Sequence, residues 1–135
     1  MTSEFFLTLR VYIEDTDAGG IVYYVNYLKF MERARTEFMR SLGYGKTAIF
    51  DTEAMFVVVS SNVEYLGSAV LDDELQVTAK PLKTGRASIL FEQCVRRGSE
   101  MLCRAEVKIA CVHRQQRSPQ AMPDSMFEKI RSCTV

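Results

Sequence analysis

The sequence predicts an α+β domain in which one long helix lies across an antiparallel sheet of about five strands. One stretch, residues 24–42, has apolar side chains at helical spacing, and several later stretches alternate in hydropathy as strands do. The connections between those later stretches are of hairpin length, whereas a parallel crossover needs a dozen residues or more. At 135 residues the chain can bury a real core, and we expect one domain, 1–135.

The first predicted strand covers residues 5–13, and one face of it holds Phe5, Leu7, Leu9, Val11 and Ile13. The helix places its apolar residues on one face, which holds Tyr27, Phe30, Met31, Ala34, Phe38 and Leu42. Gly43 is positioned to end the helix. Asn26 is a candidate N-cap, and a start nearer Tyr23 or Tyr24 fits the pattern as well.

Four further strands are predicted, at residues 55–65, 74–82, 86–97 and 100–113. Short connections at 83–85 and 98–99 make the last three strands antiparallel neighbours. Residues 44–54 are irregular, with a helical turn expected at 48–50, and a short helix is expected at 125–130. Because the helix covers only one face of the sheet, association through a sheet edge or the outer face is a reasonable hypothesis.

The composition argues against several classes of function. Lysine and arginine total 17 and aspartate and glutamate total 17, so the charge balance does not point to nucleic acid. No apolar run approaches the roughly 18 residues of a membrane span, and we expect no signal peptide. The four cysteines form no close pair, which indicates reduced thiols in a cytoplasmic protein. The single histidine, His113, has no triad-like surroundings.

The most informative stretch lies before the helix, where the acidic turn Asp15-Thr16-Asp17 is followed by Gly19 and Gly20. The first amides of a helix have no partner inside it and carry the positive end of its dipole. A substrate carbonyl held there is polarised, and Asp17 is placed to act on the same carbon as a base or a nucleophile. The alternative is that the two aspartates only satisfy amides of the turn and the helix start.

Other motifs fail on inspection. Residues 43–47 end like a phosphate-binding loop, but Arg40 stands where that motif requires glycine. An EF-hand interpretation of the acidic turn fails because Asn26 occupies the position of the bidentate glutamate. The Asp-x-Asp turn, with Asp72-Asp73 as a second pair, resembles metal-dependent phosphatases of the haloacid-dehalogenase type, but those enzymes need a parallel sheet with alternating helices. We expect no metal and no cofactor.

The stretch from Val11 to Glu37 closely resembles the 4-hydroxybenzoyl-CoA thioesterase-like branch of the hotdog-fold superfamily. The nearer likeness is to the bacterial acyl-CoA thioesterases associated with the Tol-Pal system. The residues that carry it are EDTDAGGIVY at 14–23, Asn26-Tyr27 and ERARTE at 32–37, with weaker likeness at 63–65, 71–73, Gly85 with Ser88, and 105–107. The resemblance implies the hotdog fold, a long central helix wrapped by an antiparallel sheet.

By this resemblance Asp17 matches the catalytic carboxylate, and Tyr24 matches the position whose backbone amide polarises the thioester carbonyl. The Tol-Pal-associated members usually have histidine at that position, so a backbone role survives the change and an imidazole role does not. Arg86 is the basic candidate for binding the CoA portion. The alternative interpretation is that it is a solvated arginine at a strand end. Ser60 and Ser61 are candidates for lining the acyl or pantetheine region. The alternative interpretation is that they lie on a polar face of the strand.

The resemblance implies an acyl-CoA thioesterase that works as a homo-oligomer, a dimer or a homotetramer, with its site at a subunit interface. The substrate is an acyl-CoA or a thioester of acyl carrier protein, and the sequence does not determine the length or type of its acyl group. Direct attack by Asp17 and activation of water by Asp17 are both compatible with the sequence. The alternative function is a noncatalytic module that binds acyl thioesters or acyl carrier protein without turnover.

Overall fold

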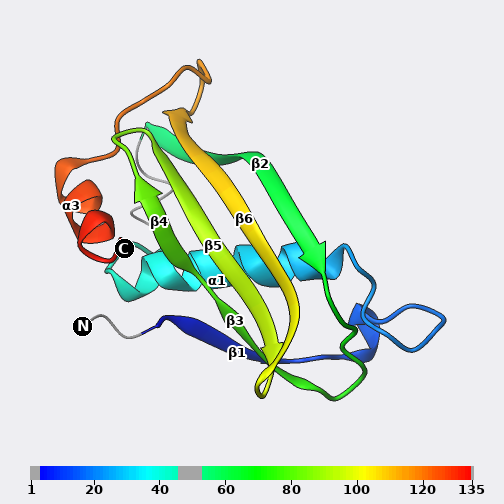
Figure 1. Ribbon diagram of the computed structural model, residues 1–135. Coiled ribbons are helices and arrows are strands. Elements are labelled where there is room, and N and C mark those ends of the chain that lie inside the picture. The colour runs from blue at the N-terminus through cyan, green and yellow to red at the C-terminus, as the bar shows by residue number, and fades with distance from the viewer. Residues whose placement is uncertain (1–3, 46–52, 135) are drawn as a thin grey trace.

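The computed structural model describes residues 4–45 and 53–134, in which a long helix lies across an antiparallel sheet (Figure 1). The strands pair in the order β1-β3-β5-β6-β2, with β4 also paired to β5. Their bounds are β1 Phe6–Arg10, β2 Ala54–Tyr65, β3 Glu74–Thr78, β4 Lys80–Thr84, β5 Ser88–Arg97 and β6 Glu100–His113. Every pairing is antiparallel, which confirms the predicted fold class. The helical turn expected at 48–50 lies outside the described residues.

Helix α1, Asn26–Ser41, packs its apolar face against the inner face of the sheet. The face predicted from the sequence is confirmed, since its members are buried and Leu42 packs against them. Phe38 joins the helix to two parts of the sheet, with its ring centroid 5.7 Å from that of Phe5 and 5.7 Å from that of Phe91. Gly43 follows the helix with φ of 97°, a left-handed conformation that favours glycine, as predicted for a helix end.

The first strand is shorter than predicted. It ends at Arg10, and Ile13 lies in a short 3-10 helix, η1, Ile13–Asp15, with 76% of its surface exposed. The prediction that the strand continues to Ile13 is therefore wrong. The physical reason is that the Asp15 carboxylate accepts a hydrogen bond from the Tyr12 amide at 2.8 Å, which turns the chain before another strand residue can form.

The strand predicted at 74–82 is two strands with a break at Ala79, so the sheet has six strands where about five were expected. Pro81 has no N–H to donate to a ladder, and the pairing of β4 with β5 shifts its register between Pro81 and Lys83. The break lets β3 pair with both β1 and β5 while β4 pairs with β5. The sheet curves around the helix (Figure 1).

Gln93 is a fully buried polar side chain that joins α1 to the sheet at this break. Its Nε2 donates to the carbonyl of Met31 on α1 at 2.9 Å and to the carbonyl of Thr78 at the end of β3 at 3.0 Å. Its Oε1 accepts a hydrogen bond from the Arg35 guanidinium at 2.9 Å. Because an unpaired buried carbonyl costs about 1–3 kcal/mol, this one amide stabilises the contact between the helix and the bent strand.

The start of α1 also differs from the prediction. Val25 occupies the N-cap position without a side-chain cap, and Asn26 lies inside the first turn. Asn26 is buried, and its Nδ2 donates to the Asp15 carbonyl at 2.8 Å. The N-cap prediction for Asn26 is therefore wrong, because its amide holds the preceding acidic turn and caps no helix amide.

The chain ends in helix α3, Asp124–Ser132, which confirms the short helix predicted at 125–130. Its buried residues are Met126, Phe127 and Ile130, which join the main core. Within residues 4–45 and 53–134, no helix combines the length and the apolar character that crossing a membrane requires.

Replacing Gln93 with leucine should lower the free energy of unfolding by about 2–4 kcal/mol, because it leaves the two carbonyls and the guanidinium without their partner. Urea unfolding followed by circular dichroism measures the change. Glu92→Leu, at an exposed position of the same strand, should cost less than about 1 kcal/mol. Equal stability of Gln93→Leu and the wild type would contradict the role given to this amide.

Candidate active site

The acidic turn and its glycines form a loop that folds back on itself before α1. The amide of Asp17 donates to the Ile21 carbonyl at 3.0 Å, and Thr16 and Val22 form a β-bridge. Gly20 sits at the tip with φ of 82°, a conformation that side-chain-bearing residues rarely adopt. In Figure 1 this loop projects beyond the start of α1. The fold thus delivers Asp17 to the end of the molecule where the helix begins.

The Asp17 side chain is exposed, and the turn uses one of its two oxygens. Its Oδ1 accepts a hydrogen bond from the Gly19 amide at 2.8 Å. Its Oδ2 accepts no hydrogen bond from the described residues. The carboxylate therefore stabilises its own turn, as the alternative interpretation expected, and still presents one oxygen to a ligand or a water molecule.

Asp15 has a purely structural place in the same turn. Besides binding the Tyr12 amide through its carboxylate, it accepts two hydrogen bonds through its carbonyl. The donors are the Tyr23 amide at 3.0 Å and Asn26 Nδ2 at 2.8 Å. These bonds tie the acidic turn to the start of α1, so the two aspartates have different functions.

The turn that leads into α1 leaves two backbone amides without a partner among the described residues. The amides of Asn26, Tyr27 and Leu28 donate to the carbonyls three residues earlier, at 2.8, 3.3 and 3.1 Å. The amides of Tyr24 and Val25 donate in none of the backbone hydrogen bonds found among the described residues. They lie at the positive end of the helix dipole, where a carbonyl oxygen or an anion is stabilised. Among the described residues, the Tyr24 amide is therefore open to a ligand.

A chain of aromatic rings connects this turn to the core. The Tyr24 ring lies 5.1 Å from that of Tyr23 and 5.8 Å from that of Tyr65, and the Tyr65 ring lies 5.8 Å from that of Tyr27. Tyr27 is 2% exposed, whereas Tyr65 and Tyr24 are 44% and 57% exposed. Tyr65, at the end of β2, was not predicted as a site residue, because nothing in its local sequence places it beside a turn 40 positions earlier.

The two predicted serines lie on the edge strand of the sheet. Ser60 and Ser61 are exposed on β2, which is paired on one side by β6, and a bulge separates Val58 from Ser60. They belong to the strand that ends at Tyr65, so they lie along the same edge as the aromatic cluster.

Arg86 lies at the other end of the sheet. It connects β4 to β5, where its guanidinium pairs with Asp124 at 2.9 Å and lies 4.4 Å from the centroid of the Phe127 ring. The far end of β5 is about 30 Å away at 3.3 Å per residue, and Arg97 there contacts the loop next to the acidic turn. The described chain therefore does not bring Arg86 and Asp17 together.

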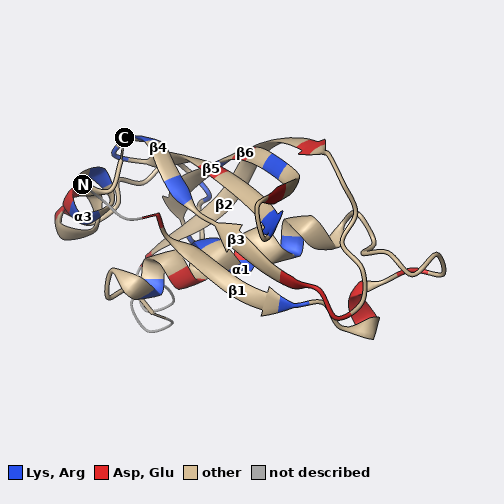
Figure 2. Ribbon diagram, turned by 60° about the horizontal axis from the view of Figure 1, so that its bottom comes forward, with Lys and Arg blue, Asp and Glu red and all other residues tan. Residues whose placement is uncertain are grey.

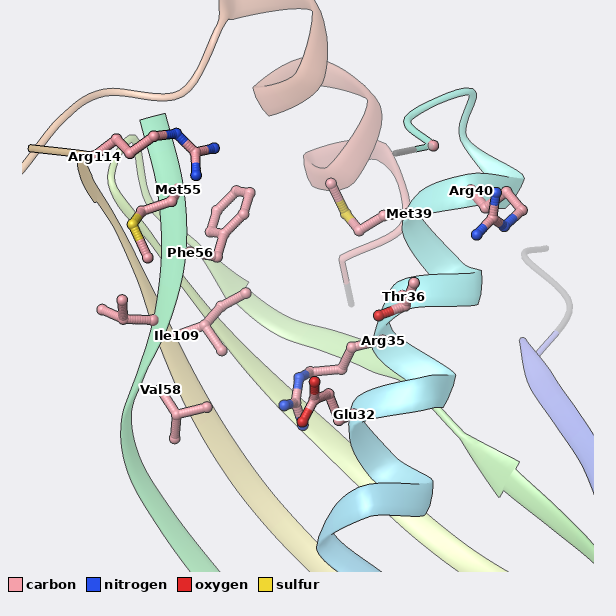
Figure 3. Close-up of a pocket in the computed structure, with 12 residues that line it drawn as sticks. Glu32, Arg35, Thr36, Met39, Arg40, Met55, Phe56, Val58, Ile109 and Arg114 are labelled. Carbon is pink, nitrogen blue, oxygen red and sulfur yellow. The ribbon is translucent and has the colours of Figure 1, made fainter. Parts of the chain in front are cut away.

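A cavity of about 570 Å³ lies between α1 and strands β2 and β6, and sequence reasoning did not predict it (Figure 3). The helix contributes polar groups, and the strands contribute apolar ones. Lining side chains include Glu32, Arg35, Thr36, Met55, Phe56 and Ile109. Its volume is within the range of small-molecule sites in proteins.

Arg35 is a half-buried charge in the lining of this cavity. Figure 3 shows its guanidinium directed from α1 into the space in front of β2, beside the Glu32 carboxylate. Burial lowers the pKa of Arg35, and the charge of Glu32 opposes that effect. Gln93 holds the guanidinium from behind at 2.9 Å. The cavity thus combines an apolar strand wall with a helix wall that carries Glu32, Arg35 and Arg40, and Arg114 also lines it.

Acidic residues gather at the end of the molecule where α1 begins (Figure 2). In the loop between β2 and β3, the Asp73 carboxylate pairs with Arg97 at 2.6 Å, and the backbone carbonyl of Asp72 accepts a hydrogen bond from Arg10 at 2.7 Å. Among the described residues, no group of three or more His, Cys, Asp or Glu side chains is arranged to hold a metal. The antiparallel sheet contradicts the phosphatase alternative.

His113 has a local structural role. It ends β6, and its Nδ1 accepts hydrogen bonds from the amides of Gln115 and Gln116 at 3.2 and 3.1 Å. The imidazole therefore stabilises the turn that follows the strand.

Comparison with known proteins identifies one family. A family model described as "Thioesterase superfamily" matches residues 19–104. An acyl-CoA thioesterase, YbgC, of Haemophilus influenzae is 43% identical over 120 residues, which cover 88% of this chain and 88% of that protein. An acyl-CoA thioester hydrolase, YbgC, of Escherichia coli O6:H1 is 37% identical over 131 residues, which cover 96% of this chain and 98% of that protein.

Solved structures agree with these relatives. A probable thioesterase from Bartonella henselae matches with a TM-score of 0.84 at 31% identity, covering 90% of this chain and 100% of that chain. A 1,4-dihydroxy-2-naphthoyl-CoA thioesterase from Synechocystis matches with a TM-score of 0.87 at 19% identity, covering 96% of each chain, and at that identity it shows the fold alone.

Proposed function

This chain belongs to the thioesterase superfamily and is a thioester hydrolase, and from that premise we propose that it hydrolyses acyl-CoA thioesters to the free acid and the CoA thiol. One observation carries the catalytic part of the proposal. The open carboxylate oxygen of Asp17 and the unpaired amide of Tyr24 belong to one folded turn at the start of α1. The names of the relatives support acyl-CoA as the substrate.

The two groups have complementary functions in hydrolysis. The Tyr24 amide, at the positive end of the helix, polarises the thioester carbonyl and stabilises the charge that develops on its oxygen. Asp17 either attacks the carbonyl carbon, forming a mixed anhydride that water then cleaves, or takes a proton from the attacking water. Both routes release the thiol and the carboxylic acid and consume one water molecule.

Such a sparse site suffices because a thiolate is a good leaving group. With a solution pKa of about 8.5 for an ordinary thiol, it departs without a strong general acid. The proposed roles therefore need no histidine, and the role of Tyr24 lies in its backbone and not in its phenol.

Asp17→Asn should lower turnover about a hundredfold or more, because the amide neither attacks nor accepts a proton from water. The Oδ1 atom of the new asparagine can still accept the hydrogen bond from the Gly19 amide, so the turn and the thermal stability should be retained. Thiol release from a panel of short, long and aromatic acyl-CoAs measures the effect. Tyr24→Phe, which keeps the backbone amide, is the matched control and should retain turnover within about threefold. Near-normal turnover by Asp17→Asn would overturn the assignment.

We further propose that the cavity beside Arg35 receives the acyl chain. Its strand wall is apolar, and its position along α1 begins six residues after Asn26, or about 9 Å from the helix start. An acyl group that follows the helix from the Tyr24 amide therefore enters the cavity only when the chain is several carbons long.

Thr36→Phe should shorten the preferred acyl chain, because a benzyl group on α1 would occupy the cavity (Figure 3). We expect kcat/KM for dodecanoyl-CoA to fall about tenfold and kcat/KM for butanoyl-CoA to change little. Lys29→Phe, at an exposed position of α1 outside the cavity lining, is the control. An unchanged ratio between the two substrates in Thr36→Phe would show that the acyl chain lies elsewhere.

We propose a homo-oligomer, a dimer or a homotetramer, as the working state. Two features support it: β2 is an open sheet edge on which Val58 and Val59 are exposed, and the Asp17 side chain is exposed in the single chain. Light scattering should give the mass of two or four chains, and a monomer mass would contradict the proposal. The four free cysteines support a cytoplasmic location.

The alternative function is a noncatalytic module for acyl thioesters or acyl carrier protein. The open oxygen of Asp17 favours the enzyme, because a pure binding site has no need of it. The thiol-release panel separates the two, since a module binds acyl-CoA or acyl carrier protein without releasing thiol. Parallel assays with acyl-CoA and acyl carrier protein thioesters separate the two carriers.

A further inference from the structure

The acidic turn has its tertiary support in the loop that connects β2 to β3, residues 66–73. The Val22 amide donates to the Ala69 carbonyl at 2.9 Å, and Ile21 and Val70 form an antiparallel bridge. We call residues 66–73 the supporting loop. The conformation of the supporting loop therefore contributes to the position of the turn that carries Asp17.

Asp73 is the internal anchor of the supporting loop. Its Oδ2 accepts the Val70 amide at 2.9 Å and the Arg97 guanidinium at 2.6 Å. Burial opposes ionisation of Asp73, but the hydrogen bonds from Val70 and Arg97 and the guanidinium charge outweigh burial, so its pKa lies below the ordinary value. The carboxylate is therefore ionised and paired at neutral pH.

Arg97 joins this anchor to the end of β5. Besides Asp73, it donates to the Ser68 carbonyl at 3.4 Å and to Glu100 at 2.8 Å, so it contacts the supporting loop at two points and its own hairpin at a third. Both partners are partly shielded, with side-chain exposure of 33% for Arg97 and 17% for Asp73. An ion pair fixed by three contacts is more rigid than an isolated surface pair.

A continuous series of contacts runs from this ion pair to the catalytic candidate. Arg97 binds Asp73, Asp73 binds the amide of Val70, Val70 pairs with Ile21, and the Ile21 carbonyl accepts the amide of Asp17. Each contact in the series is an ion pair, a hydrogen bond to a backbone amide or a backbone β-bridge. The loop also contains Asp72 with φ of 72°, a strained conformation for a non-glycine residue that persists only when surrounding contacts impose it.

We propose that Arg97 and Asp73 are positioning residues for the reaction, which hold the Asp17 carboxylate in place through the supporting loop. The inference rests on the proposed function of Asp17 and goes beyond it, since neither residue touches the turn. A displacement of about 1 Å at a reacting group costs up to a hundredfold in rate, so a small relaxation of the supporting loop is expected to be visible in turnover.

The test is Arg97→Met, which keeps the aliphatic stem and removes the charge. We expect kcat to fall about tenfold or more with KM changed less than about twofold. Arg97→Lys should restore part of the loss, because it keeps a cation within reach of Asp73. Arg104→Met is the matched control, since Arg104 forms an exposed ion pair with Glu64 on the neighbouring strand, and it should leave kcat unchanged.

A double-mutant cycle with Asp17→Asn separates positioning from general destabilisation. If Arg97 acts through Asp17, Arg97→Met should have little further effect on the residual turnover of Asp17→Asn. The same factor of loss in both backgrounds, or unchanged kcat in the single variant, would overturn the inference. Should Arg97→Met fail to fold, Asp73→Asn in the same cycle decides between the same outcomes. Normal turnover by Asp17→Asn alone would instead overturn the proposed function.

Discussion

The fold of the site depends on the pairing of the acidic turn with the segment that enters α1. Asp15 receives hydrogen bonds from Tyr23 and Asn26, and Asp17 pairs its amide with Ile21, so the carboxylate and the helix start form one unit. The same turn ends with amides that the helix cannot satisfy. An exposed carboxylate and an electrophilic backbone position are thus delivered by about ten consecutive residues, and the rest of the fold holds that unit in place.

The sheet and helix provide the rigidity that this unit lacks by itself. Helix α1 is fixed by its buried apolar face and by the Gln93 amide, which joins it to the bent strand. The loop between β2 and β3 then carries the turn through backbone pairs, and Arg97 ties that loop to the end of β5. A site made of so few groups needs this support, because nothing within the turn prevents it from moving as a whole.

The features that could be predicted from the sequence are those marked by a regular spacing of apolar residues or by a short motif. The helix, the hairpins and the Gly43 helix end follow from spacing and from glycine, and the structure confirms them. The misplaced residues were decided by contacts between distant segments or by side-chain competition for backbone groups. Ile13 is exposed because Asp15 binds Tyr12, and Asn26 is not a cap because it binds Asp15. The cavity and the roles of Tyr65 and Arg97 involve residues far apart along the chain, which a periodicity cannot reveal.

The central claim is that Asp17 and the Tyr24 amide act on one carbonyl group. A crystal structure with an acyl-CoA analogue that has a methylene ketone in place of the thioester tests it most directly. The account predicts the ketone oxygen about 2.7–3.1 Å from the Tyr24 nitrogen and the carbonyl carbon within about 3.5 Å of an Asp17 oxygen or of a water bound to it. A ketone seated against other donors, with Asp17 of every subunit remote from it, would contradict the account.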